Sequence, residues 1–139
     1  MARWLTCLQI VGISILGSGC ALAQALVTNP LDQKLQPYLD RLNRGRPTMV
    51  APTLRQEKST VFNGVMTNIY TEVNRTAYEL APMNLSVTQR PLIFPAICQT
   101  NDTGRMLREG YSFRYLYYGK DRKLAGQLMI IPSDCASVR

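Results

Sequence analysis

Residues 111–131, YSFRYLYYGKDRKLAGQLMII, decide the fold of this chain. Aromatic residues occupy every second position from Tyr111 to Tyr117, and the alternation resumes at Leu124 after the turn sequence Gly119-Lys120-Asp121-Arg122. Period two on both sides of a short polar turn predicts an antiparallel β-hairpin. One face of such a hairpin is usually buried, so we predict that the aromatic row packs beneath helices. The alternative is an exposed aromatic surface that binds a glycan or a partner protein.

A second hairpin is predicted upstream of this one. Residues 48–74 have the composition of extended chain, and Asn63-Gly64 is a dipeptide favoured in tight hairpin turns. After this turn, β-branched residues alternate with other side chains over 65–73. That alternation is typical of a strand with one buried face.

Two helical regions complete the pattern. Asn29-Pro30 predicts a helix start, because Asn is a good N-cap and Pro suits the first helical position. Leucines at helical spacing follow it: Leu31, Leu35, Leu39 and Leu42. Pro37 lies within this run and predicts either a kink or a later start. Residues 84–109 are predicted to be helical with interruptions, since Pro91 and Pro95 argue against one straight helix.

The first 23 residues are predicted to be a secretory signal peptide. Arg3, the apolar run over 5–16 and Ala21-Leu22-Ala23 are typical of its charged start, apolar centre and cleavage site. The run is shorter than the roughly 20 apolar residues that span a bilayer. Cleavage would leave residues 24–139 in the bacterial periplasm or outside the cell. The alternative is a lipoprotein anchored through Cys20, although Gly17 departs from the lipobox pattern.

The exported chain is predicted to be one α+β domain over residues 24–139, a small antiparallel sheet with helices packed on one face. It retains two cysteines, Cys98 and Cys135. An even pair of cysteines in an exported protein predicts a disulfide. A zinc site is a poor alternative, because two thiols without any His cannot complete the usual ligand set.

Composition excludes several kinds of active site. The chain has no His, which removes the Ser-His-Asp and Cys-His arrangements. The 9 Asp and Glu residues form no recognisable acid–base pair, and neither a Gly-rich phosphate loop nor a Ser nucleophile elbow occurs. We therefore expect no enzyme, no cofactor and no metal site. A hydrolase whose carboxylates assemble from distant positions is the remaining enzymatic alternative.

The net charge of +7, from 16 Lys and Arg against 9 Asp and Glu, favours an acidic or anionic partner. Candidate contact residues lie at the tip and outward flank of the second hairpin: Arg114, Tyr118, Lys120, Arg122 and Lys123. A second candidate patch lies at the end of the first helix: Arg41, Arg44 and Arg46. Both groups also have a purely structural explanation, since cations complement a helix C-terminus and turns are solvated.

The layout resembles a class of small exported bacterial α+β proteins of uncharacterised function. The residues that carry this resemblance extend over most of the exported chain: Leu42-Asn43-Arg44-Gly45, Cys98, Gly110-Tyr111, Tyr115 to Tyr118 and Pro132-Ser133-Asp134-Cys135. None of these motifs is catalytic. The resemblance therefore implies an arrangement of elements and no activity.

We expect a non-catalytic envelope protein that binds a partner protein with an acidic surface. It would act as an inhibitor or immunity factor, or as an accessory component of a secretion or envelope machine. The alternative is a module that binds anionic cell-wall or lipopolysaccharide groups. No nucleic-acid partner is expected, because the sequence carries no nucleic-acid-binding motif.

Overall fold

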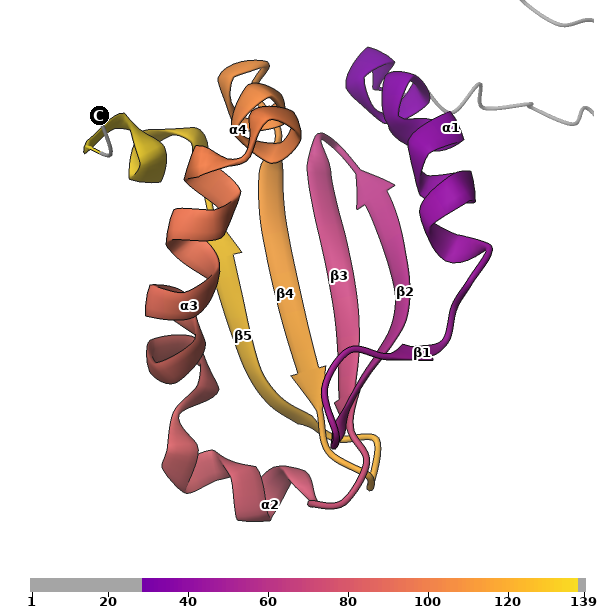
Figure 1. Cartoon of the computed structure of the whole chain (residues 1–139), viewed down its shortest axis with the longest axis vertical. Coiled ribbons are helices and arrows are strands. Elements are labelled where there is room, and N and C mark those ends of the chain that lie inside the picture. The colour runs from indigo at the N-terminus through magenta and orange to yellow at the C-terminus, as the bar shows by residue number, and fades with distance from the viewer. Residues whose placement is uncertain (1–28, 138–139) are drawn as a thin grey trace, which may run out of the picture.

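The computed structural model describes residues 29–137, which form an α+β fold with one five-stranded sheet (Figure 1). The strands are β1 (Thr48–Met49), β2 (Leu54–Phe62), β3 (Val65–Glu72), β4 (Ser112–Tyr118) and β5 (Leu124–Ile130). The helices are α1 (Pro30–Asn43), α2 (Ala77–Leu80), α3 (Leu85–Gln99) and α4 (Asn101–Arg108), with short 3₁₀ turns η1 (Ala81–Met83) and η2 (Pro132–Ser137). The predicted signal peptide and Cys20 lie outside the described residues.

The strand order follows the sequence, but the central pairing is parallel. Both predicted hairpins are present, since β2 pairs antiparallel with β3 and β4 pairs antiparallel with β5. Between them, β3 runs parallel to β4, with Val65 opposite Ser112 and Thr71 opposite Tyr118. The wholly antiparallel sheet that we predicted is therefore mixed at its centre. The cause is the helical segment between β3 and β4, which returns the chain to the edge where β3 began, as a parallel pairing requires.

Helix α1 begins as its sequence predicts, and a side chain in its first turn fastens it to the sheet. The side chain of Asn29 accepts a hydrogen bond from the Leu31 amide at 2.9 Å. In the first turn, the Asp32 carboxylate accepts from the amides of Asn63 and Gly64, both at 2.7 Å, which joins the helix to the β2–β3 turn. Both turn residues have positive φ, at 49° and 71°, which explains the Asn-Gly sequence there. Pro37 lies inside the helix and does not begin it.

The helical region over residues 84–109 is interrupted as predicted, but the break lies at Thr100, between α3 and α4, and α3 is continuous through both prolines. Pro91 and Pro95 both lie within it, one turn apart on its exposed face. The carbonyl groups that they leave without a helical partner belong to residues 87 and 91, which are also exposed, so water can satisfy them. Proline is tolerated here because the bonds it removes lie on the solvent side.

The helices cover one face of the sheet, as predicted. Figure 1 shows α1 beside β2 and α3 beside β5, with β3 and β4 between them. The aromatic row that starts just before β4 and continues along it points to this inner face. Its four side chains are at most 5% exposed: Tyr111, Phe113, Tyr115 and Tyr117. They join the helical residues Leu35, Leu39 and Ile97 in one core cluster. The other face of the sheet is its outer face, which carries no helix in the described part of the chain.

The predicted disulfide is present between Cys98 and Cys135, whose Cα atoms are 5.4 Å apart. It joins the end of α3 to η2, directly after β5. No helix within residues 29–137 is long and apolar enough to cross a membrane.

Candidate functional site

The tip of the β4–β5 hairpin is docked against the chain that leads into α2. The amide of Lys120 donates to the Arg75 carbonyl at 2.8 Å, and the Asp121 carboxylate accepts from the Ala77 amide at 3.0 Å. A Cβ atom at Gly119 would lie 2.2 Å from the Ala77 nitrogen, so only glycine allows this approach. The tip is therefore a fixed part of the fold and not a free solvated turn.

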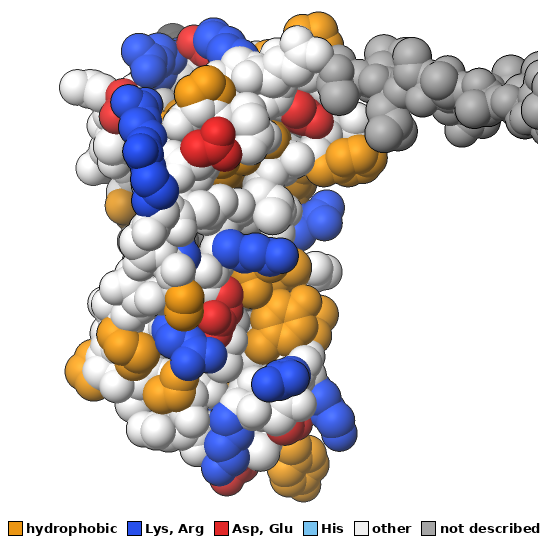
Figure 2. Space-filling model, turned by 90° about the vertical axis from the view of Figure 1, so that its right-hand side faces the viewer, with side chains coloured by type: hydrophobic (Ala, Val, Ile, Leu, Met, Phe, Trp, Pro, Cys, Tyr) orange, Lys and Arg blue, Asp and Glu red, His pale blue; other side chains and the backbone are white. Residues whose placement is uncertain are grey.

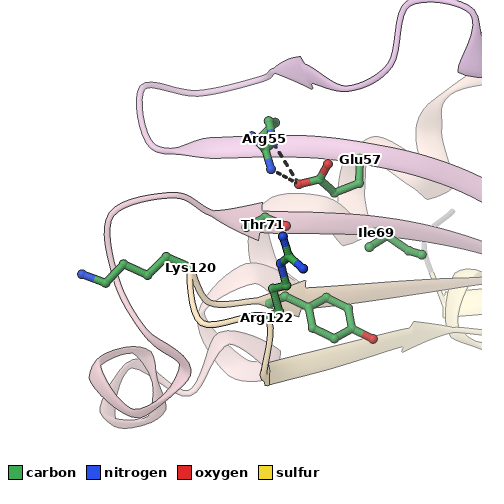
Figure 3. A pocket seen from close by; sticks show the side chains of 7 residues that line it. Arg55, Glu57, Ile69, Thr71, Lys120 and Arg122 are labelled. Carbon is green, nitrogen blue, oxygen red and sulfur yellow. Dashed lines mark hydrogen bonds and ion pairs between the residues drawn. The ribbon is translucent and has the colours of Figure 1, made fainter.

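Beside this tip, the outer face of the sheet is hollowed by a depression of about 520 Å³, which we call the outer hollow. Its lining comes from β2, β3, β4 and the hairpin loop: Arg55, Glu57, Ile69, Thr71, Tyr118, Lys120 and Arg122. Figure 3 shows Arg122 reaching from the loop toward Thr71, with Arg55 and Glu57 on the other side of Thr71. Three cations and one carboxylate give this lining a formal charge of +2.

The charged groups of the outer hollow differ in how they are paired. Arg55 forms an ion pair with Glu57, with a guanidinium nitrogen 2.8 Å from the carboxylate. Burial alone would raise the pKa of Glu57, but the Thr71 hydroxyl and the Arg55 guanidinium outweigh it and lower that pKa. The Lys120 ammonium donates to the Asn74 carbonyl at 3.0 Å, and its side chain points away from Arg122 and Thr71 (Figure 3). Within residues 29–137 the guanidinium of Arg122 has no hydrogen-bond or ion-pair partner.

The backbone of Arg122 is also unusual. Its φ of +61° lies in the left-handed region, which favours glycine and disfavours side chains with a Cβ atom. A left-handed conformation at a non-glycine residue costs on the order of 1–3 kcal/mol, and such residues are concentrated at functional sites. A free guanidinium on a strained backbone is the strongest local indication of a binding role on this face.

The structure separates the predicted contact residues into two groups. Tyr118, Lys120 and Arg122 line the outer hollow, whereas Arg114 and Lys123 do not. Arg114 is exposed on the same strand, four residues before Tyr118, which at 3.3 Å per residue is about 13 Å away. Lys123 is exposed in the loop. The hollow also contains Arg55, Glu57 and Thr71, which hairpin reasoning missed because they belong to β2 and β3.

The second predicted patch is divided. Arg41 and Arg44 are exposed and line a shallow depression with Pro37 and Asp40. Arg46 is half-buried and lies close enough to Tyr70 to influence its hydroxyl. Figure 2, which views the molecule from the side of α1, shows Lys and Arg side chains along the whole height of that side. Because positive charge is spread over this side, charge alone does not identify a binding site. The site has to be identified by its geometry.

The inner face of the sheet contains a second cavity, of about 270 Å³, which we call the inner pocket. It lies between the β1–β2 loop and the segment from α2 to α3. Its lining is mostly apolar, with one carboxylate: Ala51, Thr53, Leu54, Glu72, Arg75, Leu80, Met83, Leu85, Gln89 and Tyr117. Sequence reasoning missed this pocket, because it depends on α2, which was not predicted. The signal for α2 was the capping box formed by Thr76 and Glu79.

Glu72 is fully bonded within the inner pocket. Its carboxylate accepts from the Thr53 hydroxyl at 2.8 Å, from the Asn74 amide at 3.3 Å and from the Arg75 guanidinium at 3.3 Å. These contacts tie the β1–β2 loop to the end of β3. The Glu72 carboxylate therefore has a structural role in the wall of the pocket.

Beyond Tyr117, the inner face continues as a stack of tyrosines. The ring of Tyr70 lies 5.5 Å from that of Tyr117 and 6.3 Å from that of Tyr115. Burial raises the pKa of all three hydroxyl groups. None of the three hydroxyls bonds to another group in the described part of the chain, and none is a fully buried orphan. Tyr115 and Tyr117 belong to the core, so only the half-buried Tyr70 presents its ring and hydroxyl at the surface.

Comparison with known proteins gives matches in structure alone. No family model matches the chain, and no curated protein matches it in sequence. A solved structure of a protein from Pseudomonas aeruginosa, provisionally assigned as secreted, superposes with a TM-score of 0.62 at 15% identity. That match covers 78% of this chain and 98% of the other.

Two further matches are components of one kind of secretion system. The pilotin EpsS of the Vibrio vulnificus type II secretion system superposes with a TM-score of 0.54 at 13% identity, covering 76% of this chain and 91% of its own. The type II secretion pilotin AspS of Vibrio cholerae gives 0.57 at 12% identity, covering 76% and 92%. This chain shares their fold. At these identities the likeness establishes the arrangement of elements, and it agrees with the exported α+β class that the sequence resembles.

Proposed function

We propose that this protein is a non-catalytic, exported accessory component of a secretion or envelope machine, and that it holds a segment of a partner protein in the inner pocket. The shared fold with two pilotins of type II secretion supports the place in a secretion machine. The observation that carries the binding role is the inner pocket itself, a mostly apolar cavity between the β1–β2 loop and the segment from α2 to α3.

The chemistry of the pocket favours a partner segment with apolar side chains. Leu54, Leu80 and Leu85 offer aliphatic surface, and burial of such surface is the main source of affinity at protein interfaces. The half-buried Tyr70 extends this surface and adds a hydroxyl group that can donate to or accept from a partner backbone. Tyrosine combines a large contact area with a polar end, which is why it is common at interfaces.

Binding without catalysis is supported by the state of the pocket's carboxylate. A general acid or base needs a free position within hydrogen-bond reach of its substrate. Glu72 is only 6% exposed and is already bonded by Thr53, Asn74 and Arg75. It is held as part of the wall.

Adjacent positions of α3 provide a matched test. Gln89 lines the inner pocket, whereas Thr88 points outward and is exposed. Gln89→Glu adds a negative charge to an apolar cavity that already contains Glu72, and a buried unpaired charge is costly. Thr88→Glu adds the same charge to the same helical turn but in solvent.

The experiment is affinity capture from envelope extracts of the native host, with the full chain expressed at its normal level. We expect the wild type and Thr88→Glu to capture the same component of a secretion or envelope complex, and Gln89→Glu to capture much less of it. Equal capture by all three chains would show that the partner does not use the inner pocket. A captured partner outside any envelope or secretion complex would contradict the proposed place of action.

A further inference from the structure

We propose that the outer hollow is a second binding site, specific for a phosphomonoester group, and that Arg122 is its principal contact. The outer hollow and the inner pocket lie on opposite faces of the sheet. The two sites can thus be occupied independently, and this inference goes beyond the proposed function.

The charge of the outer hollow is matched to a dianion. Arg55, Lys120 and Arg122 against Glu57 leave a formal charge of +2. A phosphomonoester carries about −1.5 to −2 at pH 7, whereas a carboxylate or a phosphodiester carries a single negative charge. A dianion neutralises the lining, and a single carboxylate leaves about half of its charge uncompensated.

The arrangement of donors also suits a phosphoryl group. A guanidinium presents paired N–H groups that contact two phosphate oxygens at once. The Arg122 guanidinium has no partner within residues 29–137, whereas that of Arg55 is occupied by Glu57. The Tyr118 hydroxyl supplies a further donor in the lining, whereas the Thr71 hydroxyl is occupied by Glu57 and the Lys120 ammonium by the Asn74 carbonyl.

The loop holds Arg122 in place before any ligand arrives. The Lys120 amide and the Asp121 carboxylate fasten the loop to residues 75 and 77, and the Arg122 amide donates to the Gly119 carbonyl at 2.9 Å. Binding to a preorganised group loses less conformational entropy than binding to a mobile one. Placing the Arg122 side chain over the sheet requires a left-handed backbone at this residue, which is unfavourable in free energy.

The test uses the full exported chain and four probes. Glycerol 3-phosphate and inorganic phosphate represent the free group, phosphatidylcholine vesicles doped with phosphatidic acid represent a lipid headgroup, and an oligoglutamate peptide represents an acidic protein. Binding of the soluble probes is measured by NMR titration, and binding of vesicles by co-sedimentation against vesicles doped with phosphatidylglycerol. We expect binding of the phosphomonoesters and weaker binding of the peptide and the phosphodiester vesicles.

Two neighbouring substitutions separate a built site from general positive charge. Arg122→Gln and Lys123→Gln each remove one positive charge from the loop, but only Arg122 lines the hollow. We expect Arg122→Gln to weaken binding of glycerol 3-phosphate about tenfold or more, as for loss of a charge-assisted hydrogen bond. Lys123→Gln should weaken it less than about threefold, because an exposed charge outside the site is screened. Thermal melts of both variants verify folding.

The pH dependence gives an independent readout. The ligand loses its second proton near pH 6. The charged and titratable groups that line the hollow are Arg55, Glu57, Tyr118, Lys120 and Arg122, and the lowered pKa of Glu57 keeps its carboxylate ionised between pH 5 and 7.5. Affinity should therefore rise across this range.

The remaining outcomes identify the source of the phosphate group or overturn the proposal. Binding of free phosphomonoester without vesicle binding assigns the site to a soluble ligand, and binding of both assigns it to a lipid headgroup. Stronger binding of the peptide than of glycerol 3-phosphate overturns the proposal in favour of an acidic protein. Equal losses in Arg122→Gln and Lys123→Gln, or an affinity that does not rise with pH, overturn it in favour of non-specific charge.

Discussion

At the scale of single residues, the backbone conformation that places the Arg122 side chain over the sheet also destabilises the fold. The left-handed backbone of Arg122 costs on the order of 1–3 kcal/mol, whereas a glycine there would lose only about 0.5–1 kcal/mol through its greater freedom in the unfolded chain. Arg122→Gly should therefore stabilise the fold by about 1 kcal/mol. For a domain of this size, that raises the melting temperature by about 4 °C in a thermal melt.

The neighbouring Lys123 provides the control for this substitution. The residues with positive φ among those described include Arg122 but not Lys123, so glycine at 123 relieves no strain. Lys123→Gly should lower the melting temperature. A lower melting temperature for Arg122→Gly as well would mean that the Arg122 side chain stabilises the loop through contacts and is not retained at the expense of stability.

At the scale of elements, the junction between α1 and β2 depends on one side chain. The Asn43 amide nitrogen donates to the Ser59 carbonyl and its oxygen accepts from the Ser59 amide, both at 2.8 Å. Asn43 thus occupies the place of a neighbouring strand at this point of β2. Asn43→Ala leaves both backbone groups without partners, and each unsatisfied group costs about 1–3 kcal/mol.

We expect Asn43→Ala to lower the free energy of unfolding by about 2–3 kcal/mol in a denaturant titration. Arg44→Ala, at the next position and exposed, should change it by no more than about 0.5 kcal/mol. Similar losses in the two variants would show that helix propensity at the end of α1 matters and that the contact with Ser59 does not.

The tyrosine stack between β3 and β4 predicts a particular response to alkali. Burial raises the pKa of the hydroxyls of Tyr70, Tyr115 and Tyr117, while tyrosine in the unfolded chain ionises near pH 10. The contribution of the neutral hydroxyls to stability is fully present below pH 10 and is lost as the pH rises further, because the unfolded chain releases its protons first. The free energy of unfolding should fall above pH 10.

Tyr117→Phe isolates this effect. It keeps the ring and removes a hydroxyl that has no partner in residues 29–137, so stability at pH 7 should change by no more than about 0.5 kcal/mol. Above pH 10 the variant should lose less stability than the wild type, as measured by urea titration at each pH. Parallel losses in both chains would show that the Tyr117 hydroxyl reaches solvent freely.

Local elements were predictable from the sequence, and their long-range arrangement was not. The hairpin around Asn63-Gly64 and the start of α1 at Asn29-Pro30 follow from turn and capping preferences over a few residues. The parallel pairing of β3 with β4 depends on how a long helical segment returns, which leaves no local signal. For the same reason, Tyr118 and Arg122 were found as site candidates, but their neighbours from β2 and β3 were missed.

At the scale of the whole molecule, one strand separates two surfaces. Successive residues of β4 point to opposite faces of the sheet, so Tyr117 lines the inner pocket while Tyr118 lines the outer hollow. Substitutions at adjacent positions can therefore test the two sites separately.

The bond between Cys98 and Cys135 is the covalent constraint on this arrangement. It closes a loop of 37 residues that contains α4, β4 and β5, and with them Tyr115, Tyr117 and the hairpin tip. Loss of a native disulfide from a small secreted domain costs about 2–5 kcal/mol, mainly because the unfolded chain gains freedom. Cys135→Ala should lower the melting temperature by roughly 10 °C or more.

A disulfide needs both of its sulfur atoms. This allows a sharp test of whether the stabilisation comes from the crosslink. Once either sulfur is removed, the crosslink is gone, so Cys98→Ala, Cys135→Ala and the double variant should lose nearly the same stability. Reduction of the wild type should give a similar loss, and it should leave the double variant unchanged. If the two single losses added up in the double variant, each side chain would be stabilising the fold by its own packing, since independent contributions add and shared ones do not.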